Sequence, residues 1–265
     1  KMKLLVCFKI LQDVDSVMRS DWEAAASGEL DISYTQKMIG FYDEAALEMA
    51  LRRKEQAGAE GSQVQITALT IDPEPQTFFY RNFFAVGIDQ VVRVPWREDL
   101  RFRPRQVARL LAEQAREGGF DGILMGQRTS NGDNGQTPQL LAGMLGLPCV
   151  THVTELAWRK EGLLVTHQVD GGVRHGLTAA PMVYAIGNAL HPYLRVATLR
   201  EKLKTAKRQE TVSDPVAGPQ PEKEDAPLLW LRREQRGKSC VFLEGATVAE
   251  KVQTLYDNYL GRGIG

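Results

Sequence analysis

The sequence predicts an α/β fold: a doubly wound, mostly parallel sheet with helices on both faces, an added β-hairpin region and an extended C-terminal arm. Up to residue 148, short apolar runs alternate with segments whose apolar residues recur at helical spacing. This alternation is typical of parallel strands joined by right-handed helical crossovers, and strands covered on both faces are apolar throughout. After residue 148, alternating β-branched strands separated by turn signals predict hairpins.

Each element of the parallel sheet has its own local signal. The predicted strands are apolar runs of strand length, at residues 4–8, 64–71, 90–94 and 122–125. The predicted helices have apolar side chains at helical spacing, at residues 43–57, 75–85, 104–117 and 137–145. Glycines are expected to end the first three, at Gly58, just before Gly87, and at Gly118.

The second half predicts antiparallel strands and then a helix. Hairpin strands are expected at residues 150–158, 163–169 and 173–177. The apolar run at residues 182–186 could return to the main sheet. Residues 199–208 have the pattern of a basic amphipathic helix.

Composition excludes several classes of protein. Lysine plus arginine and aspartate plus glutamate both number 33 among 265 residues, so net charge attracts neither nucleic acid nor an anionic membrane. No apolar run approaches the roughly 18 residues of a membrane span, and the first ten residues lack the features of a signal peptide. We therefore expect a soluble chain with no nucleic-acid partner and no direct membrane insertion.

Cysteine and histidine usage gives no sign of a metal or of covalent catalysis. Cys7, Cys149 and Cys240 are far apart without a CxxC pair, which fits a reducing cytoplasm and predicts neither a disulfide framework nor a zinc site. The four histidines form no HExxH pair, and there is no GxSxG elbow. We expect no metal and no catalytic residue.

Residues 121–148 are the most informative segment, because a buried strand, a glycine-rich turn and a helix follow one another there. Thr137 is a suitable N-cap, and Pro138 suits the first helical position. Free amides at such a helix start favour a phosphate, which Gly132 and Gly135 let the backbone approach closely. The segment predicts an anion site, although such connections are also ordinary scaffold, and it matches neither the P-loop nor the GxGxxG spacing.

Three turns are expected to meet beside this segment. Ligands of a doubly wound sheet bind beyond the carboxyl ends of its strands. The turns at those ends that bear on the site are at residues 7–12, 71–75 and 126–137.

Together, these segments resemble the beta subunit of electron-transfer flavoprotein over nearly the whole chain. The nucleotide loop and helix at residues 126–148 are the most specific match, and the residues in register are Gly126, Asp133, Gln136, Thr137, Ala142 and Gly143. Three further segments are similar to the family's first strand and turn, the helix that follows, and the region of the partner-recognition loop, at residues 6–13, 42–55 and 195–207.

The resemblance implies a heterodimer with an alpha subunit that carries the redox-active FAD. This subunit would bind an adenine nucleotide, either AMP without a redox role or, as in members that split electrons from NADH, a second FAD. By register, the nucleotide contacts are Cys7, Gly40, Phe41, Tyr42, Asp43, Ile71, Gln127, Arg128, Thr129, Ser130, Asn131, Gly132, Asp133, Asn134, Gly135, Gln136, Thr137 and Pro138.

The resemblance also implies a docking site for a redox partner. Leu199 matches the leucine that in the family inserts into an acyl-CoA dehydrogenase or other partner, and Arg195 lies in the same segment. The alternative for Leu199 is an ordinary helix-start residue on its own domain. The alternatives for the surrounding basic residues are a solvated face or RNA binding, of which net neutrality favours the solvated face.

Two departures from the family bear on the ligand. Gly40-Phe41 replaces the common Asn-Pro before the second helix, at a contact to the sugar or base. Gly132-Asp133 resembles the form with a second FAD as closely as the form with AMP. AMP is favoured, because nothing in the sequence is specific for NADH.

The sequence patterns and the resemblance together predict three regions. Residues 1–209 are expected to form a nucleotide-binding α/β domain of the beta-subunit type, residues 210–227 a proline-rich charged linker, and residues 228–265 a C-terminal arm. The arm combines an apolar cluster around Trp230 with a strand-like run and a helical pattern, at residues 228–231, 241–243 and 247–260. The arm packs either on the partner subunit or on its own domain.

Two other functions fit the predicted sheet. A standalone universal-stress-like regulator would bind an adenine nucleotide but has no use for an apolar arm. An ATP-dependent ligase-like enzyme would need a glycine- and serine-rich phosphate loop after the first strand, which residues 9–13 do not provide.

Overall fold

The computed structural model describes residues 1–24, 30–100, 102–129, 133–178, 181–215 and 240–261. The chain divides into two units, residues 1–222 and 223–265. No helix within the described ranges combines the length and the apolar character that a membrane span requires.

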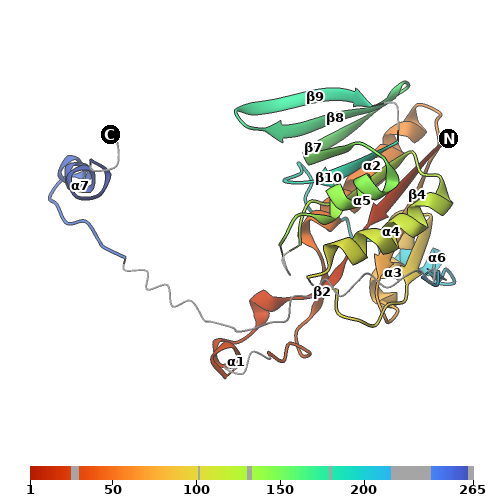
Figure 1. Ribbon diagram of the computed structural model, residues 1–265, viewed down its shortest axis with the longest axis horizontal. Coiled ribbons are helices and arrows are strands. Elements are labelled where there is room, and N and C mark those ends of the chain that lie inside the picture. Colours follow the sequence, from red (N-terminus) through yellow and green to blue (C-terminus); the bar gives the residue numbers. More distant parts are fainter. Residues whose placement is uncertain (25–29, 101, 130–132, 179–180, 216–239, 262–265) are drawn as a thin grey trace. The chain divides into compact units, whose positions relative to one another are not determined.

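The described part of the first unit is built on one nine-stranded sheet in the order β11-β5-β4-β1-β6-β10-β7-β8-β9 (Figure 1). The parallel strands are β1 Met2–Cys7, β4 Val64–Ile71, β5 Gln90–Val94, β6 Gly122–Gly126, β7 Cys149–Arg159, β10 Met182–Ile186 and β11 Thr211–Val212. The antiparallel additions are β8 Gly162–Val169 and β9 Gly172–Thr178. The predicted α/β class and the hairpin region are confirmed.

Two strands connect distant parts of the chain to the sheet. β10 returns between β6 and β7, parallel to both, as the sequence allows. β11 pairs with β5, with Thr211 opposite Val92. This strand lies within the range expected to be a linker, because backbone pairing with an open sheet edge needs no apolar side chains.

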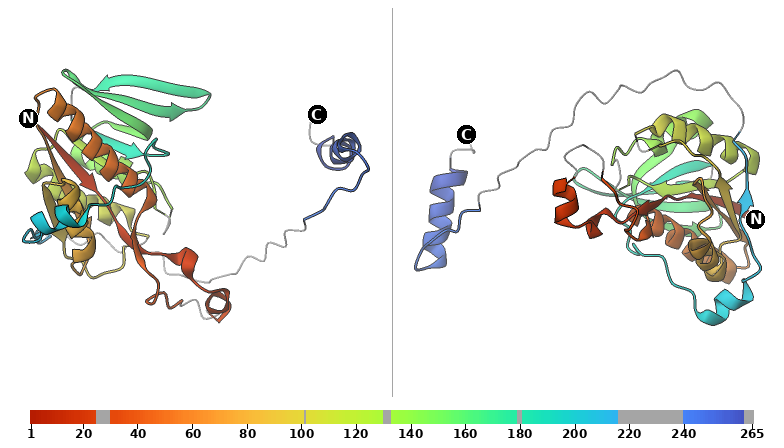
Figure 2. Two further views of the ribbon diagram at one scale, coloured as in Figure 1. Left: turned by 180° about the vertical axis from the view of Figure 1, so that it is seen from behind. Right: turned by 90° about the horizontal axis from the view of Figure 1, so that it is seen from below.

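Helices cover both faces of the sheet (Figures 1 and 2). α2 Phe41–Ala59 and α3 Thr77–Val86 lie on one face, and α4 Pro104–Gly118 and α5 Thr137–Leu145 lie on the other. The alternation within β1 fits both layers, since Leu4 and Val6 join the core under α2 while Leu5 and Cys7 join the core under α4. This doubly wound arrangement places the turns after β1, β4 and β6 at one edge.

An excursion after β1 was not foreseen from the sequence. β2 Ile10–Gln12 pairs antiparallel with β3 Lys37–Ile39, and 3-10 helix η1 Val14–Ser16 and helix α1 Arg19–Ala24 lie between them. The three-residue strands are too short to give a periodic signal.

The predicted ends of two helices were wrong. α2 continues through Gly58 to Ala59, and it is Gly61 that adopts the left-handed φ of 72° that suits glycine. α6 Leu199–Lys204 is shorter than the expected 199–208. The hydroxyl of Thr205 donates to the carbonyl of Glu201 at 3.2 Å, which competes with continued helix.

The second unit is described over residues 240–261. α7 Val248–Leu255 is followed by the π-helical turn η3 Tyr256–Leu260, which confirms the helix expected at 247–260. The strand expected at 241–243 does not form, since no strand neighbours it among the described residues. The cluster around Trp230 lies outside the described residues.

Candidate functional site

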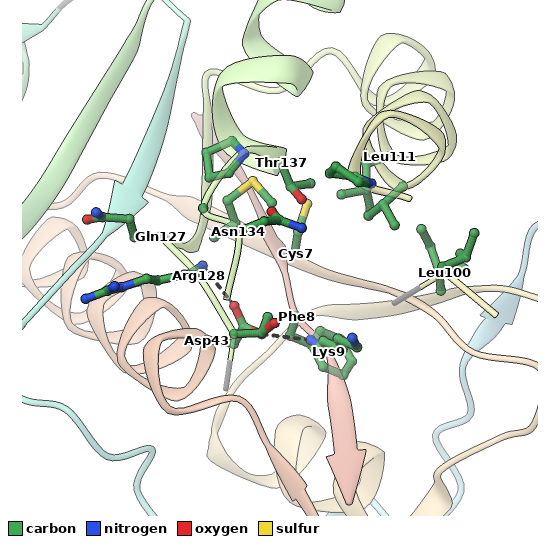
Figure 3. A pocket seen from close by; sticks show the side chains of 18 residues that line it. Cys7, Phe8, Lys9, Asp43, Leu100, Leu111, Gln127, Arg128, Asn134 and Thr137 are labelled. Carbon is green, nitrogen blue, oxygen red and sulfur yellow. Dashed lines mark hydrogen bonds between the residues drawn. The ribbon is translucent and has the colours of Figure 1, made fainter. Parts of the chain in front are cut away.

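A cavity lies at the carboxyl ends of β1, β4 and β6, where the sequence predicts converging turns (Figure 3). It is lined by Cys7, Phe8, Lys9, Asp43, Ile71, Leu100, Pro104, Val107, Leu111, Met125, Gly126, Gln127, Arg128, Thr129, Asn134, Gly135, Thr137 and Pro138. One side is therefore built from the glycine-rich loop and the start of α5, and the other from apolar side chains at and before α4.

Asp43, in the first turn of α2, ties two of these strand ends together. One carboxylate oxygen accepts a hydrogen bond from the backbone N–H of Lys9 at 2.9 Å, and the other accepts from the N–H of Gly126 at 2.8 Å. Lys9 follows β1 and Gly126 ends β6. The dashed lines in Figure 3 mark these hydrogen bonds, through which a single buried side chain joins two strand ends that line the cavity.

Burial raises the pKa of Asp43 to about 7, against the two backbone hydrogen bonds and the charge of Lys9, which lower it. Burial also raises the pKa of the Cys7 thiol far above its usual range, and the nearby Asp43 adds to this. A thiol in this environment stays protonated, so Cys7 is an apolar part of the wall rather than a nucleophile.

Glycine is required at the point where Asp43 meets β6. A Cβ on Gly126 would lie 2.5 Å from an Asp43 carboxylate oxygen and 2.9 Å from the Cβ of Tyr42. A Cβ on Gly40 would lie 2.8 Å from the other oxygen of Asp43. Both glycines therefore leave the space that the carboxylate occupies.

The described part of the glycine-rich loop contains two residues with positive φ and two local side-chain contacts. Asp133 and Gly135 have positive φ angles of 38° and 62°. Asp133 forms an ion pair with Arg128 at 3.6 Å, and the side-chain oxygen of Asn134 accepts from the N–H of Gln136 at 3.0 Å. Gly135 meets the predicted need for glycine, while Gly132 lies outside the described residues.

The helix α5 has the predicted bounds, but its N-cap differs by one residue from the prediction. The helix begins at Thr137, so Gln136 is the N-cap and Pro138 is the second helical residue. Thr137 is therefore not the N-cap that the sequence predicts, and the side chain of Gln136 makes no capping hydrogen bond. Thr137 and Pro138, the first two residues of the helix, line the cavity, so the cavity lies beside the helix end that favours an anion.

The apolar side of the cavity was not predicted from the sequence. Leu100, Pro104, Val107 and Leu111 come from α4 and the turn before it. α4 follows β5, so its N-terminus lies at the same carboxyl edge as the other turns. The proline at the first helical position and the i, i+3, i+7 spacing of Pro104, Val107 and Leu111 are the signal that could have found this wall.

Comparison with known proteins decides the family. The electron transfer flavoprotein domain matches residues 33–215. A provisionally named electron transfer flavoprotein subunit of Escherichia coli (strain K12), YgcR, is 31% identical over 98% of each chain. This chain belongs to the electron transfer flavoprotein family.

The relatives place the chain on the beta-subunit side of the electron transfer flavoprotein family. The electron transfer flavoprotein beta subunit of Dictyostelium discoideum is 27% identical over 81% of this chain and 82% of its own length. The beta subunit of Homo sapiens is 31% identical over 65% of this chain and 66% of its own length. The resemblance inferred from the sequence is confirmed, and the match favours it over a standalone regulator.

Most of the nucleotide contacts expected of an electron transfer flavoprotein beta chain line the cavity: Cys7, Asp43, Ile71, Gln127, Arg128, Thr129, Asn134, Gly135, Thr137 and Pro138. The expected contacts that do not line it are Gly40, Phe41, Tyr42, Asp133 and Gln136. Ser130, Asn131 and Gly132 lie outside the described residues. Phe8, Lys9 and Gly126 also line the cavity and belong to turns expected there, although they were not among the expected contacts, whereas Met125 was missed together with the apolar side.

Two of the expected contacts lie instead in an aromatic group at the start of α2. The Phe41 ring meets those of Tyr42 and Tyr193 edge-on, with centroids 5.3 and 5.8 Å apart. The Tyr42 hydroxyl lies 3.5 Å from the side-chain oxygen of Asn188. Phe41 and Tyr193 are exposed, so this group faces outward beside the cavity.

The two expected partner-recognition residues differ in their surroundings. Leu199, the first residue of α6, is 74% exposed, and Val196 and Leu203 beside it are 79% and 68% exposed. The guanidinium of Arg195 instead donates to the carboxylates of Glu48 and Glu55 on α2, which raises its pKa further. Arg195 therefore anchors its segment to the domain within the chain.

The described residues contain no group of three histidine, cysteine or acidic side chains placed to hold a metal ion. The three cysteines are free, with Cys7 buried and Cys240 exposed. The cavity combines two strand ends joined by Asp43, a helix start on one side and an apolar wall on the other.

Proposed function

We propose that this chain is the beta subunit of a heterodimeric electron transfer flavoprotein, binds an adenine nucleotide in the cavity, and docks redox partners for the FAD of an alpha subunit. The observation that carries the proposal is a cavity at the carboxyl edge of the sheet, beside the start of α5, in a chain of this family. Isoalloxazine chemistry would be supplied by the flavin of the alpha subunit. The residues of this chain would bind the adenine nucleotide and position the redox partner.

The two sides of the cavity suit the two ends of an adenine nucleotide. A phosphate suits the first amides of α5 and the guanidinium of Arg128, because a helix start and a cation both favour an anion. The adenine suits the side formed by Ile71, Val107 and Leu111, which offers apolar contact. Asp43 would hold the two strand ends against which the nucleotide rests.

We propose AMP rather than a second FAD as the occupant. A second FAD would need space for an isoalloxazine ring beyond the first phosphate, and the apolar side described here accounts for one base. The nucleotide would then be structural. This part of the proposal is separable, because a second FAD would leave the rest intact.

We propose that Leu199, Val196 and Leu203 form the docking surface for an acyl-CoA dehydrogenase or another redox partner. Their exposed apolar side chains gather at α6, which Arg195 fixes to α2. An exposed leucine held on a fixed segment can enter a partner's pocket at small entropic cost.

We propose further that residues 228–265 form an arm that packs on the alpha subunit. Val248, Val252 and Leu255 of α7 expose apolar side chains within their own unit. Such side chains need a partner surface to leave water.

We propose that the protein is cytoplasmic, because its three cysteines are free.

The test is to count cofactors. The full chain is co-purified with the subunit encoded beside it, the complex is denatured, and released flavin and adenylate are measured per chain. One FAD and one AMP per heterodimer is the expected result, and two FAD would assign the cavity to a second flavin. A chain that purifies alone, with no flavin-bearing partner, would contradict the proposal and favour a standalone adenine-nucleotide regulator.

A further inference from the structure

Gln127 joins the cavity to strands on the far side of β6. It is the first residue after β6 and lines the cavity, and its backbone N–H donates to the carbonyl of Ile186 on β10 at 2.9 Å. Its side chain points away from Leu100 and Leu111 in Figure 3. The side chain reaches His152 on β7, which lines a separate groove with His167.

Two contacts fix the orientation of the Gln127 amide. The backbone N–H of His152 lies 3.1 Å from the Gln127 side-chain oxygen, and since an N–H can only donate, that atom must be the oxygen. The amide nitrogen then faces Nε2 of His152 at 3.1 Å. An NH₂ group donates, so Nε2 must be the unprotonated acceptor and the ring proton must be on Nδ1.

The backbone at His152 is shaped for this contact. His152 has a φ of 54°, which is uncommon for a residue other than glycine. Thr151 and His152 together face the single residue Ala185 of β10, so β7 has a bulge at this point. Bulges re-aim side chains, and here the imidazole is turned to Gln127.

A glycine leaves room for the approach. A Cβ on Gly187, at the end of β10, would lie 3.3 Å from the Cα of His152 and 3.4 Å from the side-chain oxygen of Gln127. The bulge at His152, Gly187 and the side-chain amide of Gln127 therefore pack together beside the cavity.

We propose that His152 is the positioning residue for Gln127, and that its unprotonated Nε2 holds the first residue of the nucleotide loop in its binding geometry. The inference rests on the proposed function, because it assumes that the cavity binds a nucleotide. The loop after β6 carries Arg128, and its backbone leads to the start of α5. A Gln127 side chain that is free to rotate would leave Gln127 with its backbone hydrogen bond to Ile186, and nucleotide binding would then have to order the side chain as well.

Two variants that differ by one methylene group test the hydrogen bond. His152→Asn tolerates a positive φ but is too short to place an acceptor at Nε2, whereas His152→Gln can place its carbonyl oxygen there. In the full heterodimer freed of nucleotide, we expect His152→Asn to bind AMP about fivefold more weakly, as befits the loss of one hydrogen bond, with affinity restored in His152→Gln. His167→Asn, in the neighbouring groove, is the control and should bind as the wild type does.

A second measurement does not depend on the nucleotide. With only four histidines in the chain, ¹⁵N labelling of histidine followed by NMR can assign the His152 ring by comparison with His152→Gln. An unprotonated Nε2 with a protonated Nδ1 is expected. A protonated Nε2, or a His152→Asn variant that binds AMP as tightly as the wild type, would overturn the proposal. A wild type with the expected tautomer that does not bind AMP would confirm the clamp and contradict the proposed function instead.

Discussion

Asp43 combines two opposing effects on the pKa of one carboxyl group. It is buried, which favours the protonated form, and it accepts backbone hydrogen bonds at 2.9 and 2.8 Å, which favour the ionised form. Burial prevails, since the pKa is raised to about 7. Burying this carboxyl group costs free energy, but its two hydrogen bonds join the turns after β1 and β6.

We predict that Asp43→Asn destabilises the chain. The amide keeps one acceptor, but its NH₂ group would face a backbone N–H, so one hydrogen bond is lost and a buried donor is left unpaired. The free energy of unfolding should fall by about 1–3 kcal/mol in urea denaturation. Asp31→Asn, at an exposed position, is the control and should leave it unchanged. A wild-type-like stability of Asp43→Asn would show that the clamp contributes little.

The raised pKa of Asp43 predicts a pH dependence of stability. The folded chain retains a proton there that the unfolded chain releases near the ordinary pKa of 3.8. The stabilising contribution is therefore complete below that value and is lost as the pH rises through about 7. Between about pH 5 and about pH 8, the wild type should lose more stability than Asp43→Asn. If the free energies of unfolding of the two proteins changed in parallel with pH, the raised pKa of Asp43 would be refuted.

The junction of α2 and β6 depends on Gly126, which has no side chain. Any Cβ at Gly126 would overlap the Asp43 carboxylate at 2.5 Å, so the helix start and the strand end could not both stay in place. The geometry of the cavity therefore depends on the contact between α2 and β6 and not on a single loop.

Gly126→Ala tests this junction against a glycine of the same region. We expect a loss of about 1–3 kcal/mol and weaker nucleotide retention, because the overpacked carboxylate must move. Gly143→Ala is the matched control, since a Cβ there meets nothing within 4 Å and α5 should gain about 0.5–1 kcal/mol. Thermal melting compares the two, and equal melting temperatures would contradict the role given to Gly126.

Local patterns were sufficient to predict much of this level of the structure. The strands β4 and β5 and the helix α5 have the predicted bounds, because each is a periodic or apolar run with a clear stop. The loop side of the cavity followed from strand order and from the glycines around Gly135. The clamp of Asp43 on Gly126 could not follow, because it joins residues 83 positions apart through space. The bulge at His152 was equally hidden, since a strand pattern does not reveal a positive φ.

The first unit carries both the cavity and the exposed apolar residues around Leu199. The two are joined by α2, whose N-terminal turn carries Asp43 and whose later turns hold Arg195 through Glu48 and Glu55. A nucleotide that stiffens the start of α2 would thus also stiffen the base of the docking segment.

The docking role proposed for Leu199 predicts a selective loss of electron transfer. Leu199→Asp should slow reduction by a partner dehydrogenase roughly tenfold, since a charge would replace an apolar anchor. Leu199→Met, which keeps an exposed apolar side chain, is the control and should react near the wild-type rate. Both variants should melt like the wild type, because the side chain is 74% exposed. Unchanged kinetics in Leu199→Asp would place the docking surface elsewhere.

We infer that this chain works as one half of a flavoprotein, with an adenine nucleotide in its cavity. Native mass spectrometry of the complex purified without added cofactor measures both the subunits and the bound nucleotides. We expect one copy of each subunit with one FAD and one AMP, and loss of the AMP alone from the Gly126→Ala variant. A complex that carries FAD but never an adenine nucleotide bound to this chain would refute the inference.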